Sequence, residues 1–81
     1  MSKPSKTTDP VFILAGTSPE YTEARRKLAL IPAQAYWLTR PSNLAGKHRP
    51  LVYRYGDWKS LAKLKEIEAA MTAAEADVVD L

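Results

Sequence analysis

The run of residues 11–15 constrains the fold of this chain more than any other feature. All five residues are apolar, two of them are β-branched, and the run ends at Gly16. A strand that is apolar on both faces has to be covered on both sides, as in the sheets of α/β proteins. The run therefore predicts a central strand with other elements packed above and below it.

A helix is expected directly after this strand, because two overlapping start signals are present. Ser18 can be the N-cap with Pro19 in the first turn, or Thr17 and Glu20 can form a capping box. Pro32 ends the helix near residue 30, since proline disfavours helical geometry in the residue before it. Apolar residues at helical spacing form one stripe, which consists of Tyr21, Ala24, Leu28 and Ile31.

Two more strands and a second helix follow. The short aromatic segment 35–39 and the segment 51–55 predict strands, and the loop between them has room for one helical turn at 42–46. Alternation in 51–55 puts Leu51, Tyr53 and Tyr55 on one face, which favours an edge strand. Asp57 is a suitable N-cap for a long helix over residues 58–76. Residues 78–81 are expected to form a tail that frays or adds weakly to a sheet edge.

The expected order of elements is therefore β-α-β-β-α. We predict an α/β fold with a minimal three-stranded Rossmann-like sheet and two helices. A single domain would span residues 11–77, after a disordered N-terminal arm at 1–10. A strand, a helix and a strand imply a parallel pair with a right-handed connection. The third strand is expected to be parallel as well, but the loop before it leaves an antiparallel hairpin open.

Composition excludes several classes of chemistry. The 81 residues include no cysteine and one histidine, His48, so thiol nucleophiles, iron–sulfur clusters, cysteine-ligated zinc and two-histidine metal sites are ruled out. His48 stands between two cations without an adjacent carboxylate and is expected to be a solvated loop residue. We expect no catalysis, no cofactor and no metal. Without an apolar run of membrane-spanning length or a signal peptide, a cytoplasmic protein with no membrane partner is expected.

A small anion site is one candidate function of the expected sheet. If all strands are parallel, the segments that leave their carboxyl ends meet at one edge, together with the N-termini of both helices. Thr17, Ser18, Arg40 and Ser42 would line this edge. The chain lacks the GxGxxG fingerprint and the lysine of the phosphate loop, so these residues can equally be ordinary caps and turns.

Charge is unevenly distributed along the chain. Residues 40–59 hold five cations and one acid, a net charge of +4, whereas residues 67–81 hold four acids and no cation. Cations beside aromatic rings suit phosphate contact with base stacking. The residues of this nucleic-acid hypothesis are Arg40, Lys47, Arg49, Arg54, Lys59 and Trp58, with Thr17 and Ser18 from the anion site. In the parallel arrangement Lys47 and Arg49 lie at the opposite edge from Arg40, and the aromatic residues can instead belong to the core. The acidic end of the last helix is unfavourable by itself and indicates a partner.

A protein-binding function would use the same region differently. An adaptor or inhibitor would dock through an aromatic edge made by Tyr53, Tyr55 and Trp58, or through unpaired amides of the sheet edge. Such an edge can also pair with a second copy of the chain. Nucleic acid, a host or viral protein and a homodimer stay open as partners. Salt distinguishes them, because phosphate contacts weaken steeply with ionic strength and apolar interfaces do not.

Three segments together carry a family resemblance. They are residues 12–17 (FILAGT), 36–46 (YWLTRPSNLAG) and 52–58 (VYRYGDW). The string resembles short phage and prophage proteins of unassigned function, and its order is similar to a fragment of the second lobe of helicase-like or terminase-like ATPases without the phosphate loop. The resemblance covers residues 11–67. It implies a minimal Rossmann-like sheet and a viral or mobile-element setting in a bacterial host cell, and it carries over no catalytic residue.

Overall fold

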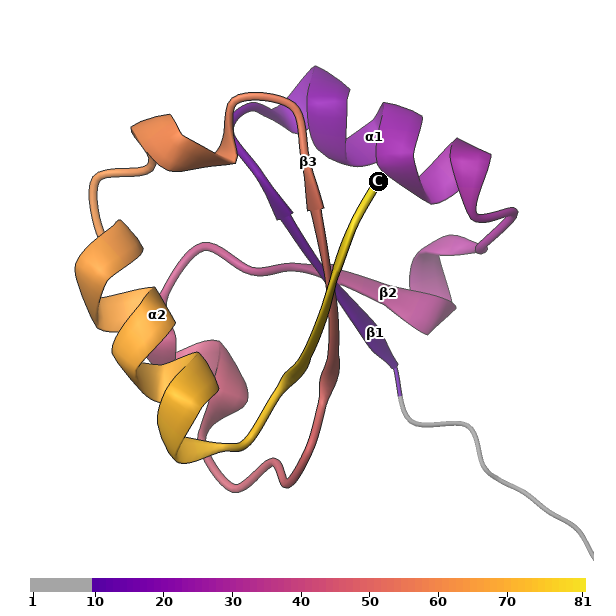
Figure 1. Cartoon of the computed structure of the whole chain (residues 1–81). Coiled ribbons are helices and arrows are strands. Elements are labelled where there is room, and N and C mark those ends of the chain that lie inside the picture. Colours follow the sequence, from indigo (N-terminus) through magenta and orange to yellow (C-terminus); the bar gives the residue numbers. More distant parts are fainter. Residues whose placement is uncertain (1–9) are drawn as a thin grey trace, which may run out of the picture.

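The computed structural model describes residues 10–81, so residues 1–9 of the predicted N-terminal arm lie outside the described part of the chain. Within residues 10–81 the fold consists of four strands and two helices (Figure 1). In chain order they are β1 (Val11–Ala15), α1 (Ser18–Lys27), β2 (Ala35–Trp37), β3 (Leu51–Tyr55), α2 (Leu64–Ala73) and β4 (Asp77–Asp80). Short 3₁₀ turns occupy Pro32–Gln34, Pro41–Leu44 and Trp58–Ser60.

The strands form one parallel sheet in the order β2-β1-β3-β4. β1 lies between β2 and β3, with Phe12 opposite Tyr36 on one side and Val52 on the other, and β3 pairs with β4. The α/β class and the parallel arrangement are therefore confirmed, and the antiparallel hairpin is wrong. The predicted number of three strands is also wrong, because residues 10–81 contribute four.

The sheet is the middle one of three layers. α1 lies on one face and α2 on the other (Figure 1). Phe12 and Leu14 of β1 pack towards α2 with Ile67, whereas Ile13 and Ala15 pack towards α1. Burial of each large aliphatic side chain contributes about 1.5–3 kcal/mol. The prediction of a central strand covered on both sides is confirmed. Neither helix of the described residues is long and apolar enough to cross a membrane.

β3 is a central strand rather than the predicted edge strand, and β4 is the edge. The residues expected to form a tail at 78–81 belong largely to β4, which is hydrogen-bonded to β3. Asp77 donates its N–H to the Pro50 carbonyl (2.8 Å), and Leu81 donates to the Arg54 carbonyl (2.9 Å). The alternation of apolar and polar residues suggested an edge strand because Arg54 is polar. In the sheet, Arg54 is paired with Asp80 of β4. The charge of Arg54 is thus accommodated in a strand with neighbours on both sides.

The predicted helix over residues 58–76 is divided in two. Trp58–Ser60 forms a 3₁₀ turn, Leu61 is extended with φ −63° and ψ 134°, and α2 begins at Leu64. The Asp57 side chain makes no capping hydrogen bond. The apolar stripe of the predicted helix consists of Leu64, Ile67, Met71 and Ala74. Trp58 lies off this stripe, so a continuous helix would turn its ring away from the core. The break lets Trp58 and Leu61 pack against the core on the α2 side.

α1 begins at the predicted position. Its N-cap is Thr17, whose hydroxyl accepts a hydrogen bond from the Glu20 N–H at 3.3 Å. The helix ends at Lys27, three residues before the expected end. β2 is also shorter than the predicted strand at 35–39, and the helical turn expected at 42–46 lies at Pro41–Leu44.

Ala29 follows α1 in a strained conformation. Its φ of 56° lies in the left-handed region, where glycine is the usual residue after a helix, and its side chain is exposed. We expect Ala29→Gly to raise the free energy of unfolding by about 1 kcal/mol, because the clash of a Cβ with the backbone disappears. Urea denaturation measures this change. The control is Ala69→Gly, which is exposed within α2 and should lower the free energy of unfolding by about 1 kcal/mol. If both variants are destabilised, the conformation assigned to Ala29 is wrong.

Candidate functional site

The carboxyl ends of β1 and β3 meet where the strand order changes direction. Ligands of open α/β sheets bind at such a point. In this protein the two loops touch there. A Cβ on Gly16 would overlap the main-chain carbonyl of Asp57, and a Cβ on Gly56 would overlap the carboxylate of Glu20. Gly56 also has a φ of 64°, so both positions require glycine.

Glu20 holds the main-chain amide at this point. Both of its carboxylate oxygens lie 3.2 Å from the Asp57 nitrogen, whose N–H they accept. The Thr17 hydroxyl is engaged in capping α1, and Ser18 is exposed in the first turn of that helix. The negative charge of the Glu20 carboxylate would repel a phosphate bound beside it. The predicted residues Thr17 and Ser18 therefore lie at the carboxyl end of the sheet, beside a negative charge.

The structure brings Arg54, Trp58 and Lys59 together on the α2 side of the sheet. The guanidinium carbon of Arg54 lies 4.5 Å from the centroid of the Trp58 ring, and Nζ of Lys59 lies 5.6 Å from it. Nε and Nη2 of Arg54 donate to the two carboxylate oxygens of Asp80 at 2.5 and 2.9 Å. Trp58 is half-buried against the core. Arg54 is thus paired with Asp80, and the Trp58 ring of the predicted stacking surface contacts Arg54 and the core.

The ion pair between Arg54 and Asp80 shifts the pKa of both partners. The hydrogen bond from Arg54 lowers the pKa of Asp80, with a further contribution from the positive charge of Arg54. The hydrogen bond to Asp80 raises the pKa of Arg54 in turn, and Glu68 adds to this effect. Asp80 and Arg54 are therefore both charged when β4 is paired with β3.

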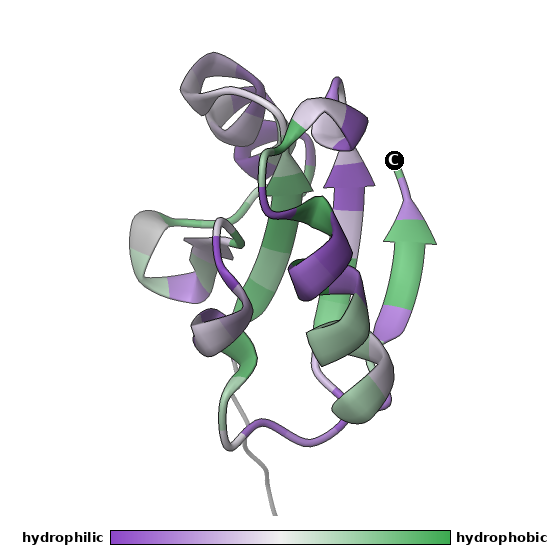
Figure 2. Cartoon of the chain, turned by 90° about the vertical axis from the view of Figure 1, so that its left-hand side faces the viewer, coloured by the Kyte–Doolittle hydropathy of each residue, from purple (hydrophilic) through white to green (hydrophobic). Residues whose placement is uncertain are grey.

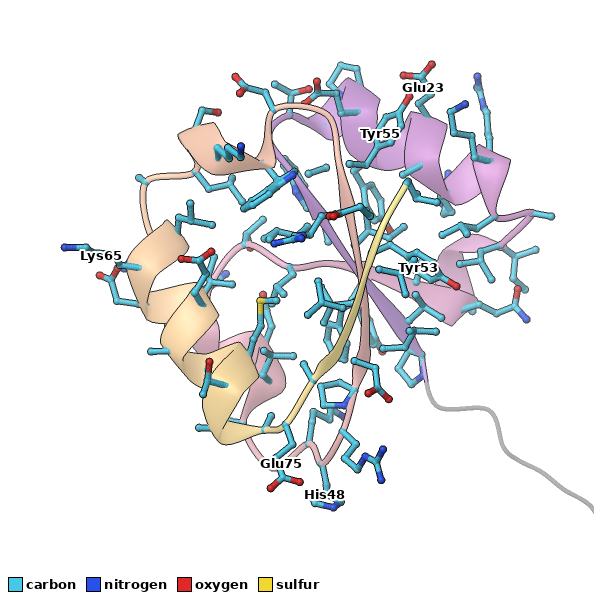
Figure 3. The ribbon with its side chains drawn as sticks, in the orientation of Figure 1. Glu23, His48, Tyr53, Tyr55, Lys65 and Glu75 are labelled. Carbon is cyan, nitrogen blue, oxygen red and sulfur yellow. The ribbon has the colours of Figure 1, made fainter. Side chains whose placement is uncertain are left out.

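Tyr53 and Tyr55 lie on the other face of the sheet. Figure 3 shows both on the side of α1, with Tyr55 close to Glu23. Desolvation, followed by the interaction with Glu23, raises the pKa of Tyr55. Tyr55 packs with the α1-side core, whereas Trp58 packs with the α2-side core. The three aromatic residues predicted as one protein-binding edge are divided between two faces.

Lys47 and Arg49 lie at the amino end of the sheet, in the loop before β3. Arg40 follows β2 and lies at the carboxyl end, on an exposed segment that also contains Ser42. Lys47, His48 and Arg49 are all exposed, and they line part of a hollow of about 470 Å³. The separation expected for parallel strands is confirmed. The five predicted cations do not form one continuous patch.

β4 presents an exposed edge with free main-chain groups. Asp77 and Leu81 direct their N–H groups at β3, so the alternation of a parallel ladder turns the N–H and C=O groups of Val78 and Asp80 outward. Val78 and Val79 are 39% and 42% exposed. Figure 2 shows β4 at the edge of the sheet, hydrophobic in its middle and hydrophilic at both ends. This edge combines unpaired polar main chain with apolar side chains.

A pocket of about 410 Å³ opens between α2 and β4, hereafter the α2–β4 pocket. Its lining residues are Glu68, Met71, Thr72, Glu75, Ala76 and Val78. Met71 is buried and gives the pocket an apolar base, whereas Glu68 and Glu75 are exposed. The pocket therefore combines a buried apolar side chain with two exposed carboxylates.

The sequence predictions gave this edge only as a tail at 78–81 that frays or adds weakly to a sheet edge, and they missed its pocket. The β-branched pair Val78 and Val79, flanked by Asp77 and Asp80, was the available signal for a strand. Four residues at the end of a chain are too short to distinguish a strand from a tail by periodicity. Glu20 and Asp80 were also missed, because each acts on a residue far away in the sequence.

Comparisons of the chain with protein-family models, with curated proteins and with solved structures found no match. The functional assignment therefore depends on the geometry described above.

Replacement of Gly16 tests the contact between the two loops. We expect Gly16→Ala to lower the free energy of unfolding by about 2–3 kcal/mol, because the new methyl group has to displace the main chain of Asp57. Gly46→Ala is the control, since Gly46 has a φ of 76° but open space around it. It should cost only about 1 kcal/mol from conformational strain. Equal losses in urea denaturation would show that the loops do not touch.

The Arg54–Asp80 pair predicts a pH dependence. The folded-state pKa of Asp80 is lowered, so its stabilising effect is complete above the unfolded-state value of about 3.9 and is lost as the pH falls through the folded-state pKa. We expect Asp80→Asn to have a lower Tm than the unmodified chain at pH 7, with the difference shrinking below about pH 4. Thermal denaturation from pH 7 to pH 2 measures it. A difference that is independent of pH would contradict the ion pair.

Proposed function

We propose that this protein is a non-catalytic binding module that adds an extended segment of a partner protein to its sheet at β4. The observation that carries the proposal is the outward N–H and C=O groups of Val78 and Asp80 on an edge strand whose four residues are all exposed. An extended peptide can pair with such groups as a further strand, and main-chain hydrogen bonds then supply much of the affinity.

The opposite edge of the sheet is less suited to strand addition. β2 has three residues, whereas β4 has four. The Ala35 carbonyl of β2 already accepts a hydrogen bond from the Tyr21 hydroxyl at 3.2 Å. Ala35 is also buried. These features favour β4 as the edge that receives a partner.

The sheet face beside β4 supports the same function. Tyr53 of β3 lies opposite Val79 of β4 in the parallel register, and Leu81 follows with 45% exposure. The α1-side core includes residues of β1 and β2 and Tyr55, but neither Tyr53 nor Val79. Side chains of an added strand that point to this face would contact Val79 and cover apolar surface.

The nucleic-acid hypothesis receives less support from the same geometry. Arg54 is bound to Asp80 and covers Trp58. A base that stacked on this ring would have to displace the guanidinium group and break the ion pair. Lys47 and Arg49 remain exposed at the far end of the sheet. Lys47 lines a second hollow with the exposed Tyr36, but none of the other four predicted cations lines it. We therefore favour a protein partner, which also suits the viral setting that the resemblance implies.

The test is a proline at a main-chain group that faces outward. Val78→Pro removes the outward N–H but no hydrogen bond to β3, so an edge strand should tolerate it. Val78→Thr is the matched control, because it keeps the N–H and the β-branch. We expect a library of displayed random peptides to enrich binders on the unmodified chain and on Val78→Thr, and Val78→Pro to lose these binders.

A second measurement guards against an indirect effect of proline on folding. Hydrogen exchange of the Val78 and Asp80 amides should slow when an enriched peptide is added to the unmodified chain, because both N–H groups become hydrogen-bonded. Binders that are retained by Val78→Pro, or that leave both amides unprotected, would place the interaction elsewhere. Absence of any enrichment would refute the proposed function.

A further inference from the structure

The α2–β4 pocket lies next to the position that an added strand would occupy. In a sheet, residues paired across neighbouring strands have their side chains on the same face. The residue of the added strand opposite Val78 would therefore project to the α2 side, as Val78 does. Val78 itself lines the pocket. One side chain of the partner is thus directed to the pocket by the strand geometry.

The lining of the pocket suits a long side chain with a positively charged end. Met71, Ala76 and Val78 offer apolar surface to a hydrocarbon stem, and Glu68 and Glu75 carry the opposite charge. Lysine and arginine have this structure, with apolar methylene groups below a charged head. Within residues 10–81 neither Glu68 nor Glu75 forms a salt bridge. Glu68 interacts only at longer range with Arg54, whose guanidinium group pairs with Asp80.

The end of α2 adds to the negative potential. The carboxyl end of a helix attracts cations. The last turn of α1 contains Arg25, Arg26 and Lys27, whereas the last turn of α2 contains no basic residue. Glu75 follows this end with a φ of 56°, a conformation in which glycine would be usual and would carry no charge. The last turn of α2 therefore supplies no cation to the end of this helix.

We infer that the α2–β4 pocket selects a lysine or arginine of the added strand, at the position opposite Val78. The next residue on either side would point to the other face, where Val79 and Tyr53 favour an apolar side chain. The recognised segment is thus an extended peptide in which a basic residue stands between two apolar ones. This inference rests on the proposed strand addition and specifies the residue type that the strand must carry.

Synthetic peptides that differ at one position test the inference. The host peptide is extended and contains Thr-Val-X-Val-Thr, with lysine, arginine, norleucine or glutamate at X. Norleucine keeps the hydrocarbon stem of lysine and removes its charge. We expect the lysine and arginine peptides to bind about three- to tenfold more tightly than the norleucine peptide, from attraction to two exposed carboxylates and the helix end. The glutamate peptide should bind more weakly than all three.

Matched protein variants assign the preference to the pocket. The double variant Glu68→Gln, Glu75→Gln should bind the lysine and norleucine peptides with equal affinity. Glu66→Gln makes the same change on α2 at a residue outside the pocket, and it should retain the preference for lysine. A preference that survives in the double variant, or that is lost in Glu66→Gln, would overturn the inference.

The outcomes separate this inference from the proposed function. If all four peptides bind equally and Val78→Pro abolishes their binding, strand addition holds and the role of the pocket is refuted. If no peptide binds the unmodified chain, both are refuted. Concentration-dependent dimerisation that Val78→Pro abolishes would make a second copy the occupant. Lys3 and Lys6 are basic residues of the chain itself. If the double variant Lys3→Gln, Lys6→Gln without peptide changes the NMR chemical shifts of the Val78 and Asp80 amides, the occupant of the edge is instead the N-terminal segment of the chain.

Discussion

Burial of β1 on both faces is the constraint on which the rest of the structure depends. An apolar strand of five residues cannot face water on either side without a large hydrophobic cost. It requires neighbours in the sheet and helices above and below. Phe12 and Leu14 need the layer that α2 provides, and Ile13 and Ala15 need α1. The chain therefore has to return to β1 twice, once on each side, and β1 lies between β2 and β3.

This arrangement brings two loops together at the carboxyl ends of β1 and β3. In many α/β proteins such a point holds a ligand. Here the Glu20 carboxylate accepts a hydrogen bond from the Asp57 N–H, and glycine at positions 16 and 56 allows the loops to touch. The point between β1 and β3 at which the topology predicts a ligand is thus filled by contacts between the protein's own loops. The outward main-chain groups of Val78 and Asp80 lie elsewhere, at β4.

Pairing between β3 and β4 gives a structural role to residues that the sequence suggests are functional. Arg54 and Trp58 resemble a charged and aromatic binding surface, but Asp80 neutralises the arginine and the core receives part of the tryptophan. The same pairing leaves Val78 and Asp80 with outward main-chain groups. Candidate contact residues therefore become structural, and four residues that read as a tail become the candidate site.

Local patterns predicted the strands best where burial is simple. β1 and β3 have the predicted bounds, since each has a clear pattern of apolar residues over five positions. The helix over 58–76 was predicted too long because helix propensity does not record where the Trp58 ring can be buried. β4 was predicted only as a tail that frays or adds weakly to an edge, because it forms a strand only when β3 offers hydrogen bonds to residues such as Asp77 and Leu81. The pocket of the candidate site could not be predicted from local patterns either, because α2 and β4 form it together.

The amino-acid sequence by itself determined the α/β class, the central position of 11–15, the start of α1 and the separation of the basic and acidic segments. These properties depend on local composition and spacing, which any stretch of chain carries with it. The tertiary structure alone decided the fourth strand, the side on which each aromatic lies, the pairing of Arg54 with Asp80 and the outward groups of β4. Each of these depends on contacts between residues distant in the chain, and such contacts exist only once the sheet has formed.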